Sequence, residues 1–205
     1  MKQFPDQIPV FPLSGVIYFP KTNLPLNIFE QRYLDLVNDT IGKDKLMGMI
    51  QGKREGNDLY KVGCLGKISE FKKSEDGRIL INLTGITRFE LLEEKNNSKL
   101  YREFIVDYSK FSLDLEPSTE EININSLMKK SEIFFKKNGL LLNWKEFEKL
   151  DITQKINTLA MIAPITNEEK QKLLESVSLK EKTKTLEDII KFYLHEVRFD
   201  SQTIQ

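Results

Sequence analysis

The side chains that most often act as nucleophiles or metal ligands are scarce in this sequence, which holds one cysteine, Cys64, and one histidine, His195. A zinc site needs about four ligands drawn from Cys, His or carboxylate groups, and the spacing gives no reason for these two residues to meet. We expect Cys64 to be a small buried thiol in a strand and His195 to lie in a helical bundle. The sequence therefore predicts no metal site, no cofactor and no Cys–His catalytic dyad.

Paired carboxylates are a second route to chemistry, because glycoside hydrolases use two Asp or Glu residues on either side of the scissile bond. Acidic pairs occur here at Glu75-Asp76, Glu93-Glu94 and Glu120-Glu121. These positions are typical of turns and helix starts, where carboxylates are solvated or favoured by the helix dipole. No pair stands out as catalytic, and a hydrolase would require a cluster of strongly shifted carboxyl pKa values in a cleft.

A group of basic residues around an aromatic ring is the feature that points to nucleic acid. Phe71 could stack on a base while neighbouring cations contact phosphates. The cations in question are Lys67, Lys72, Lys73 and Arg78. Acidic residues at positions 70, 75 and 76 lie among them and oppose a phosphate site. The pattern is more typical of a solvated hairpin, so RNA binding is kept only as the alternative function.

Composition narrows the class of protein. The chain has 205 residues, with 31 Lys and Arg against 31 Asp and Glu, and therefore a formal net charge of zero. Dedicated binders of nucleic acid or anionic membranes normally carry a basic excess. The start of the chain lacks an apolar signal region, and no stretch approaches the ~20 apolar residues of a membrane span. A single cysteine fits a reducing compartment. We expect a cytoplasmic protein that does not bind membranes, with nucleic acid a disfavoured partner.

The pattern of apolar residues changes near residue 115 and predicts a β-rich domain at 1–114 and a helical domain at 115–205. In the first part, short alternating apolar runs predict strands. The expected strands cover residues 46–51, 62–71, 78–84, 87–92 and 104–108. Asp76-Gly77 supplies the positive φ that a hairpin turn needs, and Gly85 predicts a bend or a bulge.

One helix is expected inside the β-rich part. It is indicated by apolar residues that share one face at helical spacing, namely Leu26, Phe29, Tyr33, Leu36 and Val37. Such a stripe is typical of a helix packed on a core. Asn27 and Glu30 match the N-cap and third positions of a capping box. The sequence therefore predicts that this helix begins just after Asn27.

The second part predicts a bundle of about four helices. A start signal at 118–121 and a stop at Gly139 bound the first helix, and a short helix is expected at 144–150. Pro164 ends the helix that begins at Ile152. Two further capping boxes open at Thr166 and Ser178.

Three blocks of the β-rich part carry distinctive motifs. Residues 8–33 carry the pattern FPL…FP…LPL.IFE.RY, residues 63–68 read GCLGKI, and residues 83–89 read LTGITRF after Asp76-Gly77-Arg78. These blocks resemble the N-terminal, substrate-recognition domain of Lon-type ATP-dependent proteases. Residues 59–68 are similar to the family's "vGt.a.i" strand, with Gly63-Cys64 in place of Gly-Thr, and residues 76–89 to its "dG…v.G..R..i" element. Residues 163–175 resemble the tail of standalone members. The resemblance implies an α+β fold: an N-terminal PUA-like β pseudo-barrel with one inserted helix, followed by a C-terminal helical bundle.

The resemblance also implies a function, that of a non-catalytic module that binds unfolded or exposed polypeptide segments as an adaptor or holdase. A separate protease or ATPase is an implied partner, and self-association is left open. The phosphate loop GxxxxGK[ST] of an ATPase is missing, because Gly42-Lys43 and Gly66-Lys67 precede Asp44 and Ile68. The sequence also leaves no room for a Ser-Lys peptidase module. We therefore expect no enzyme activity.

The candidate peptide-binding residues come from the motifs that carry the resemblance, and they are Phe29, Glu30, Arg32, Tyr33, Arg88 and Phe89. On a functional interpretation Glu30, Arg32 and Tyr33 form a polar lip beside an apolar peptide groove, which could lie between the two parts of the chain. On a structural interpretation, which we favour, Glu30 pairs with Arg88 and Tyr33 lies in the core. Phe29 is then a core residue whose replacement by alanine would cost about 3–5 kcal/mol. The other expected core residues of this region are Phe11, Leu13, Phe19 and Leu26.

Overall fold

The structure, a computed structural model, describes residues 4–53, 58–118 and 121–200. It divides into two compact units, Met1–Pro117 and Ser118–Gln205. The domain limits expected from the sequence, 1–114 and 115–205, stay a prediction, because compactness alone does not show that either part folds independently. None of the helices in the described part of the chain is both long and apolar enough to span a membrane.

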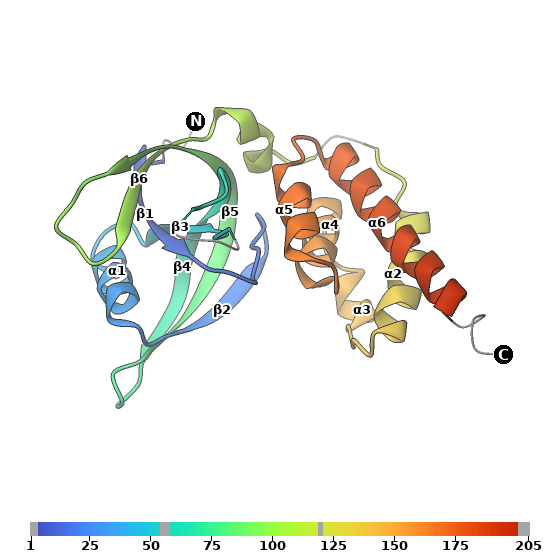
Figure 1. Cartoon of the computed structure of the whole chain (residues 1–205), viewed down its shortest axis with the longest axis horizontal. Helices are drawn as coiled ribbons and strands as arrows, with labels where there is room; N and C mark the ends of the chain where they lie inside the picture. Colours follow the sequence, from blue (N-terminus) through green and yellow to red (C-terminus); the bar gives the residue numbers. More distant parts are fainter. Residues whose placement is uncertain (1–3, 54–57, 119–120, 201–205) are drawn as a thin grey trace. The chain divides into compact units, whose positions relative to one another are not determined.

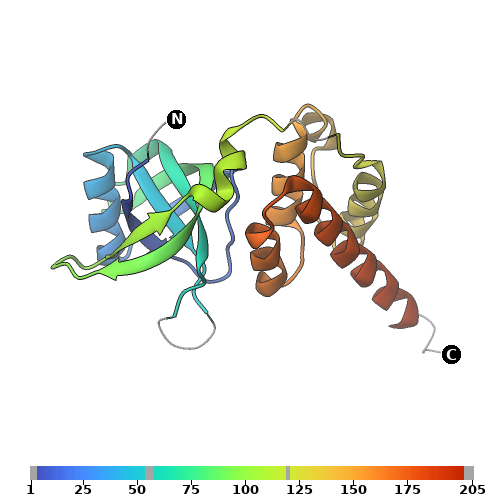
Figure 2. The same cartoon turned by 90° about the horizontal axis from the view of Figure 1, so that it is seen from above.

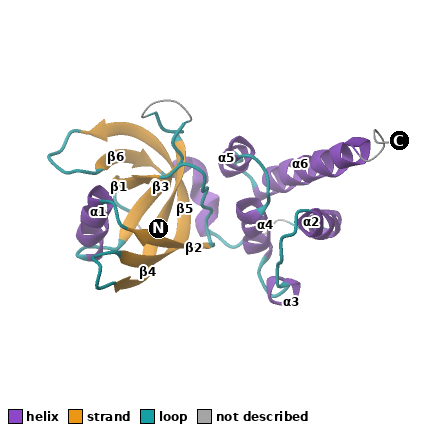
Figure 3. Cartoon of the chain, turned by 60° about the horizontal axis from the view of Figure 1, so that its bottom comes forward, coloured by secondary structure: helices purple, strands orange, loops and turns teal. Residues whose placement is uncertain are grey.

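Six strands of the first unit form one sheet that closes on itself. They are β1 (Gln7–Pro12), β2 (Asn23–Ile28), β3 (Leu46–Ile50), β4 (Val62–Lys73), β5 (Ile79–Lys95) and β6 (Arg102–Asp107). The pairings run β5–β4–β3–β1–β6 and return to β5, while β2 pairs with β5. Figures 1 and 3 show these strands curving around a common interior, with helix α1 (Gln31–Ile41) on one side. The elements confirm the expected α+β fold.

The β4–β5 hairpin forms where the sequence predicts it. Gly77 has a φ of 86°, and Asp76 Oδ1 accepts a hydrogen bond from the Arg78 N–H at 3.2 Å. Along β5, Ile79, Ile81 and Leu83 alternate with more exposed neighbours, so one face of the strand is buried. The turn and the alternation both rest on local chemistry, which is why the sequence alone locates the hairpin.

Helix α1 begins later than the sequence predicts. Asn27 lies in β2, opposite Leu80 of β5, and the helix starts at Gln31 with Glu30 as its N-cap and no side-chain capping bond. The predicted capping box at Asn27 and the helical positions of Leu26 and Phe29 are therefore wrong. Pairing of β2 with β5 over six positions outweighs the local capping signal, because sheet pairing and burial override intrinsic propensity.

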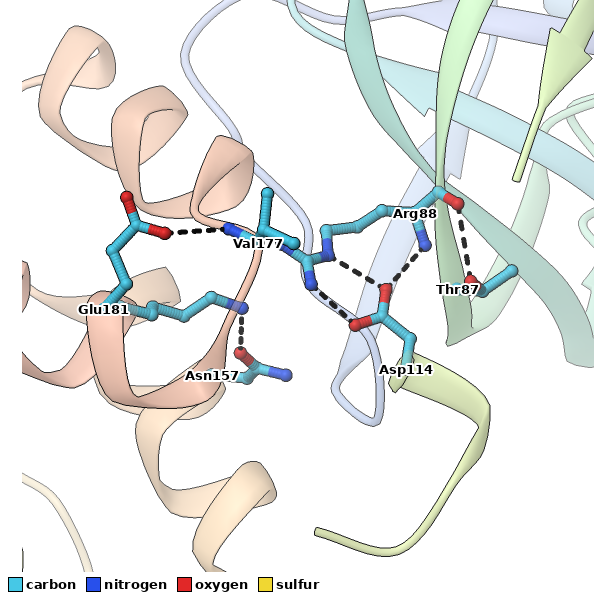
Figure 4. A network of polar contacts seen from close by, with 7 residues as sticks. Thr87, Arg88, Asp114, Asn157, Val177 and Glu181 are labelled. Carbon is cyan, nitrogen blue, oxygen red and sulfur yellow. Dashed lines mark hydrogen bonds and ion pairs between the residues drawn. The ribbon is translucent and has the colours of Figure 1, made fainter. Parts of the chain in front are cut away.

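A buried ion pair attaches the end of the first unit to its sheet. The short helix η1 (Ser109–Leu115) follows β6. Its Asp114 accepts hydrogen bonds from the Arg88 backbone N–H at 2.9 Å, from Nε at 2.9 Å and from Nη2 at 2.7 Å. The guanidinium also lies 4.3 Å from the centre of the Phe111 ring. Figure 4 shows the Asp114 carboxylate facing the Arg88 side chain. These contacts satisfy a charge that is nearly inaccessible to water.

The second unit contains α2 (Asn125–Lys137), α3 (Trp144–Phe147), α4 (Ile152–Ile162), α5 (Asn167–Glu175) and α6 (Leu179–Asp200). Helix α6 packs against α2, α4 and α5, as Figures 1 and 2 show. The described helices agree with the expected bundle. The predicted start at 118–121 is wrong, because α2 begins at Asn125; residues 119–120 of that signal lie outside the described residues.

Capping and buried polar contacts fix the helices of this unit. The Thr166 capping box is present as predicted. At the start of α6 the Ser178 hydroxyl accepts the Glu181 N–H, while the Glu181 carboxylate reaches back to the Val177 N–H at 3.1 Å, so this cap extends one residue further than expected (Figure 4). Asn157 of α4 accepts a hydrogen bond from Lys182 Nζ of α6 at 2.8 Å. The hydrogen bond from the buried Lys182 side chain thus links α6 to α4.

Removing the Asp114 carboxylate tests the buried pair. We expect Asp114→Ala to destabilise the first unit by about 3–5 kcal/mol, because Arg88 would be left as a buried, uncompensated charge. The matched control is Glu93→Ala. The side chains of Glu93 and its partner Lys95 are both exposed, so this variant should change stability by less than ~0.5 kcal/mol. Urea unfolding, followed by the near-UV circular dichroism of the tyrosines, measures the free energy of unfolding of both variants. Equal effects of the two variants would contradict the prediction.

Acid should weaken the contact between α2 and α6. Hydrogen bonds from Lys130 and Ser126 lower the pKa of the Glu187 carboxyl from its ordinary value of 4.5. A lowered folded-state pKa stabilises the fold above pH 4.5, and that contribution is lost as the pH falls through the folded pKa. Glu187→Gln should therefore be less stable than the parent at pH 7, with a gap that closes in acid. Urea unfolding read by Trp144 fluorescence measures this, with exposed Glu132→Gln of α2 as the control; a gap independent of pH would refute it.

Candidate functional site

A groove of about 400 Å³ lies at the end of β1, the end of β2 and the start of α1. Four of the six candidate residues line it: Phe29, Glu30, Arg32 and Tyr33. The remaining lining residues are Phe11, Pro12, Leu13, Ser14, Leu26, Asn27 and Ile28. All of them belong to the first unit, so this groove is not built from both parts of the chain as the sequence analysis expected. Its walls are mostly apolar side chains with a polar rim.

Tyr33 forms a rigid wall of this groove. Its ring stacks on Phe11 with centroids 4.0 Å apart and an interplanar angle of 27°, and its hydroxyl donates to the Pro12 carbonyl at 3.2 Å. Burial raises the pKa of the Tyr33 phenol, so the group is a neutral donor. Tyr33 and Phe11 are both buried, which agrees with the structural interpretation of Tyr33. The stacked pair leaves little freedom for this side of the groove to move.

An exposed ion pair stands at the rim. Arg32 Nη2 lies 2.9 Å from Glu30 Oε2, and both side chains are about half exposed. The Arg32 guanidinium also lies over the Tyr33 ring, 4.5 Å from its centre. The predicted pair between Glu30 and Arg88 is therefore wrong: Glu30 pairs with Arg32, and Arg88 with Asp114. A carboxylate two residues from Arg32 needs no tertiary contact to reach it, whereas Arg88 points toward η1.

Phe29 is on the surface, with 66% of the residue exposed. The prediction that it belongs to the core is wrong, because it lies between β2 and α1 rather than on the apolar face of the helix. Phe11 and Phe19 are buried as expected. Leu13 and Leu26 are only partly buried and contribute to the groove instead of a closed core. Phe29 is continuous with the apolar wall of the groove, and a contiguous apolar patch, unlike a single exposed apolar residue, marks an interaction site.

Arg88 and Phe89 lie away from the groove. Adjacent residues of a strand point to opposite faces, and here Arg88 faces Asp114 while Phe89 is fully buried in the core. A Cβ atom added at Gly48 or Gly63 would stand 2.8 or 2.6 Å from the Phe89 ring. The ring therefore fills the space that two glycines leave open, and its role in this structure is packing. The structure does not bring Arg88 or Phe89 together with the other four candidates.

A second hollow, of about 620 Å³, adjoins the groove and shares Pro12, Ser14, Arg32 and Tyr33 with it. Its other lining residues are Gly52, Lys53, Asp58, Leu59, Glu94 and Arg102. Arg102 donates to both oxygens of Glu94, at 2.7 and 2.6 Å. These hydrogen bonds lower the pKa of the Glu94 carboxyl. The groove is therefore apolar on one side and continues into a region with charges of both signs.

The assignment of Glu93-Glu94 to a turn or a helix start is wrong, because both residues lie in β5. Sequence reasoning also missed the contact of Glu94 with Arg102. They are eight residues apart and meet because β5 and β6 pair as an antiparallel hairpin, in which Glu94 lies opposite Phe104. The signal that could have found them is the alternation of the two strands combined with opposite charges near the turn between them. Such pairs are common on sheet surfaces, so the signal would identify a contact and not a function.

The other chemical candidates stay apart. Cys64 is buried in β4, and His195 is an exposed residue of α6. Within the described ranges no three His, Cys, Asp or Glu side chains gather as metal ligands. In the basic hairpin, Arg78 pairs with Asp76 at 2.7 Å and Phe71 is partly exposed beneath Lys45. The groove and its charged extension combine apolar walls with polar groups on one concave surface that holds four of the six candidate residues.

The comparison with known families covers most of the chain. A family model described as the ATP-dependent protease La (LON) substrate-binding domain matches residues 7–191. This chain belongs to that family. The match includes both units of the Lon substrate-binding domain, so the helices of the second unit are part of the family pattern together with the sheet.

The curated relatives that this Lon substrate-binding domain matches are longer proteins. The chain is 23% identical over 216 residues to a Lon protease of Syntrophus aciditrophicus, covering 98% of this chain and 27% of that protein. A Lon protease of Anaeromyxobacter dehalogenans is 26% identical over 201 residues, covering 92% and 23%. The chain therefore spans about a quarter of the length of these relatives. A Lon N-terminal domain protein from Xanthomonas campestris shares the fold, with a TM-score of 0.65 at 20% identity over 88% of this chain and 96% of that one.

Two phenylalanines of this site separate surface from core. We expect Phe29→Ala to change the free energy of unfolding by less than ~0.5 kcal/mol, because the side chain is exposed. Phe11→Ala should cost about 3–5 kcal/mol, because it removes a buried ring stacked on Tyr33. Urea unfolding of the two variants measures both values. A loss of several kcal/mol in Phe29→Ala would contradict the exposed position.

Proposed function

We propose that this Lon substrate-binding domain holds exposed polypeptide segments in the groove formed by the ends of β1 and β2. The observation that carries the proposal is the exposed Phe29 beside apolar walls from Phe11, Leu13 and Leu26. Apolar side chains of an unfolded segment are the ligands that such a surface favours. The polar rim of Glu30 and Arg32 keeps the surface hydrated when it is empty.

The energetics suit weak, reversible binding. A contact that removes about 300–600 Å² of apolar surface from water is worth roughly 8–15 kcal/mol before costs. Ordering a flexible segment and losing its translational freedom consume much of that gain. The expected affinity is therefore micromolar or weaker. An adaptor or holdase requires such an affinity, because it must release each segment to an ATPase or protease partner.

The charges of this domain support polypeptide over RNA. Positive and negative residues are equal in number, and the two arginines at the groove and its extension are engaged by Glu30 and Glu94. RNA binding requires cations that are available to phosphates and falls steeply as salt rises. The alternative rests on the PUA-like fold and on the basic hairpin; similarity of fold does not establish function, and Asp76 pairs with Arg78 in that hairpin.

Fluorescence anisotropy of a labelled, permanently unfolded polypeptide tests the proposal. We expect saturable micromolar binding by the parent and a loss of about fivefold to thirtyfold in Phe29→Ala, equivalent to about 1–2 kcal/mol. Leu100→Ala is the matched control, because Leu100 is similarly exposed at 64% and lines neither hollow. Its affinity should equal that of the parent.

Two outcomes would count against the proposal. One is equal affinity for folded and unfolded forms of the same polypeptide, because the groove should select exposed segments. The other is binding of single-stranded RNA alone that weakens strongly between two salt concentrations. That result would direct mutagenesis to Lys72 and Lys73 of the basic hairpin instead.

A further inference from the structure

Strand β2 has one unpaired edge, and this edge borders the groove. Within the described ranges β2 pairs with β5 and with no other strand. Its residues Leu26, Asn27 and Ile28 line the groove. An unpaired sheet edge is a ready template for another extended chain. The question is which of its backbone groups are available to such a chain.

The hydrogen-bond pattern identifies which backbone groups of β2 face the free edge. The Gly85 N–H donates to the Thr22 carbonyl at 2.9 Å, and residues 22 and 85 continue the register that pairs Asn23 with Thr84. Hydrogen-bonded pairs alternate along an antiparallel ladder, so the even-numbered residues of β2 bond to β5. The backbone groups of Asn23, Pro25 and Asn27 therefore face the free edge. Pro25 fits this pattern, because proline has no N–H to give to a ladder.

The opposite wall of the groove offers few backbone partners. The Pro12 carbonyl already accepts the Tyr33 hydroxyl, and proline has no N–H. The Leu13 N–H donates to the Ile50 carbonyl at 2.9 Å. Of the two strands that line the groove, β2 therefore offers backbone hydrogen bonds to a segment, at Asn27, while the β1 side supplies apolar contact.

We propose that the segment bound in the groove is an extended strand that adds to the free edge of β2 at Asn27, with every second side chain directed into the apolar groove. This inference rests on the proposed function and specifies its substrate class. Main-chain hydrogen bonds give affinity in this mode, and pockets for alternate side chains give preference. Pro25 confines the pairing to the end of β2 nearest Phe29.

The size of the site favours a segment over a second copy of this chain. A groove of about 400 Å³ lies in the range of ligand-binding clefts, ~300–1,000 Å³. A stable dimer buries about 1,200–2,000 Å², and β2 offers few edge positions with a proline among them. A helix would leave the Asn27 N–H and C=O unused, because its own backbone groups are bonded internally. An extended segment alone uses both the edge and the apolar wall.

Two variants at one position test the pairing. Asn27→Pro removes the outward N–H, which β5 does not use, whereas Asn27→Ala removes the side chain and keeps the N–H. With a labelled peptide of alternating valine and threonine around one phenylalanine, we expect Asn27→Pro to lose about threefold to tenfold in affinity, as the loss of one hydrogen bond predicts. Asn27→Ala alters the lining of the groove but keeps the N–H, so it should lose less affinity than Asn27→Pro; an equal loss in the two variants would count against strand addition. Circular dichroism establishes that both variants are folded.

A change in the peptide makes the test independent of the protein's folding. N-methylation of every second amide blocks one edge of a strand and leaves the other intact. One of the two alternately methylated peptides should bind the parent protein at least threefold more weakly than the other, which follows from losing about one hydrogen bond. Equal affinities would overturn strand addition, even if Asn27→Pro failed to fold.

The outcomes separate this inference from the proposed function. If the parent binds neither the unfolded polypeptide nor the peptide, both proposals fail. If it binds them and neither Asn27→Pro nor N-methylation matters, the groove binds polypeptide but strand addition is wrong. A concentration-dependent dimer that disappears in Asn27→Pro would show that a second copy occupies the edge, and would likewise overturn the inference.

Discussion

The first unit depends on the path of β5, a strand of 17 residues that pairs with three neighbours. Its first part pairs with β2 and its last part with β6, while β4 pairs with both parts. The register with β4 shifts after Gly85, where Gly66 lies opposite Gly85 but Leu65 lies opposite Thr87, and this irregularity is the bend of β5. At the bend, a Cβ atom on Gly85 would stand 2.3 Å from the Phe19 carbonyl oxygen. Hydrogen bonds from Lys21 to Gly85 and from Gly85 to Thr22 join the two segments there. The chain around Phe19 passes so close to residue 85 that only glycine fits there, and the same contact fixes where β2 begins.

This bend explains why β2 keeps a free edge. Since β5 turns away after Gly85 and pairs with β6, the ring of strands closes without β2, which is left attached on one side only. Long unpaired edges promote aggregation, and proline or short length are the usual protections. Here Pro25 interrupts the edge and Asn27 remains beyond it. The geometry that closes the sheet thus leaves β2 with a short free edge, interrupted by Pro25, next to the exposed Phe29.

Most of the fold class could be predicted, because its signals are local. The turn at Asp76-Gly77 needs only its own residues, and alternation along β5 needs only one strand. Asn27 has an equally good local signal for a helix cap, but six paired positions in β2 decide its conformation. Arg88 meets a partner 26 residues away, Asp114, and no local rule selects that carboxylate over Glu30. For Phe29, one apolar residue in a single sequence carries no mark that distinguishes a groove from a core.

The charges around the groove suggest what kind of selectivity it can have. Arg32 is engaged by Glu30 and Arg102 by Glu94, so the rim presents little net charge to a ligand. Apolar contact alone would not separate an unfolded segment from any exposed hydrophobic patch. In the proposed mode the free edge at Asn27 adds that discrimination, because folded proteins have nearly all their backbone groups paired and unfolded chains do not. Recognition through backbone groups and an apolar wall would therefore report loss of structure in a partner, with little dependence on its sequence.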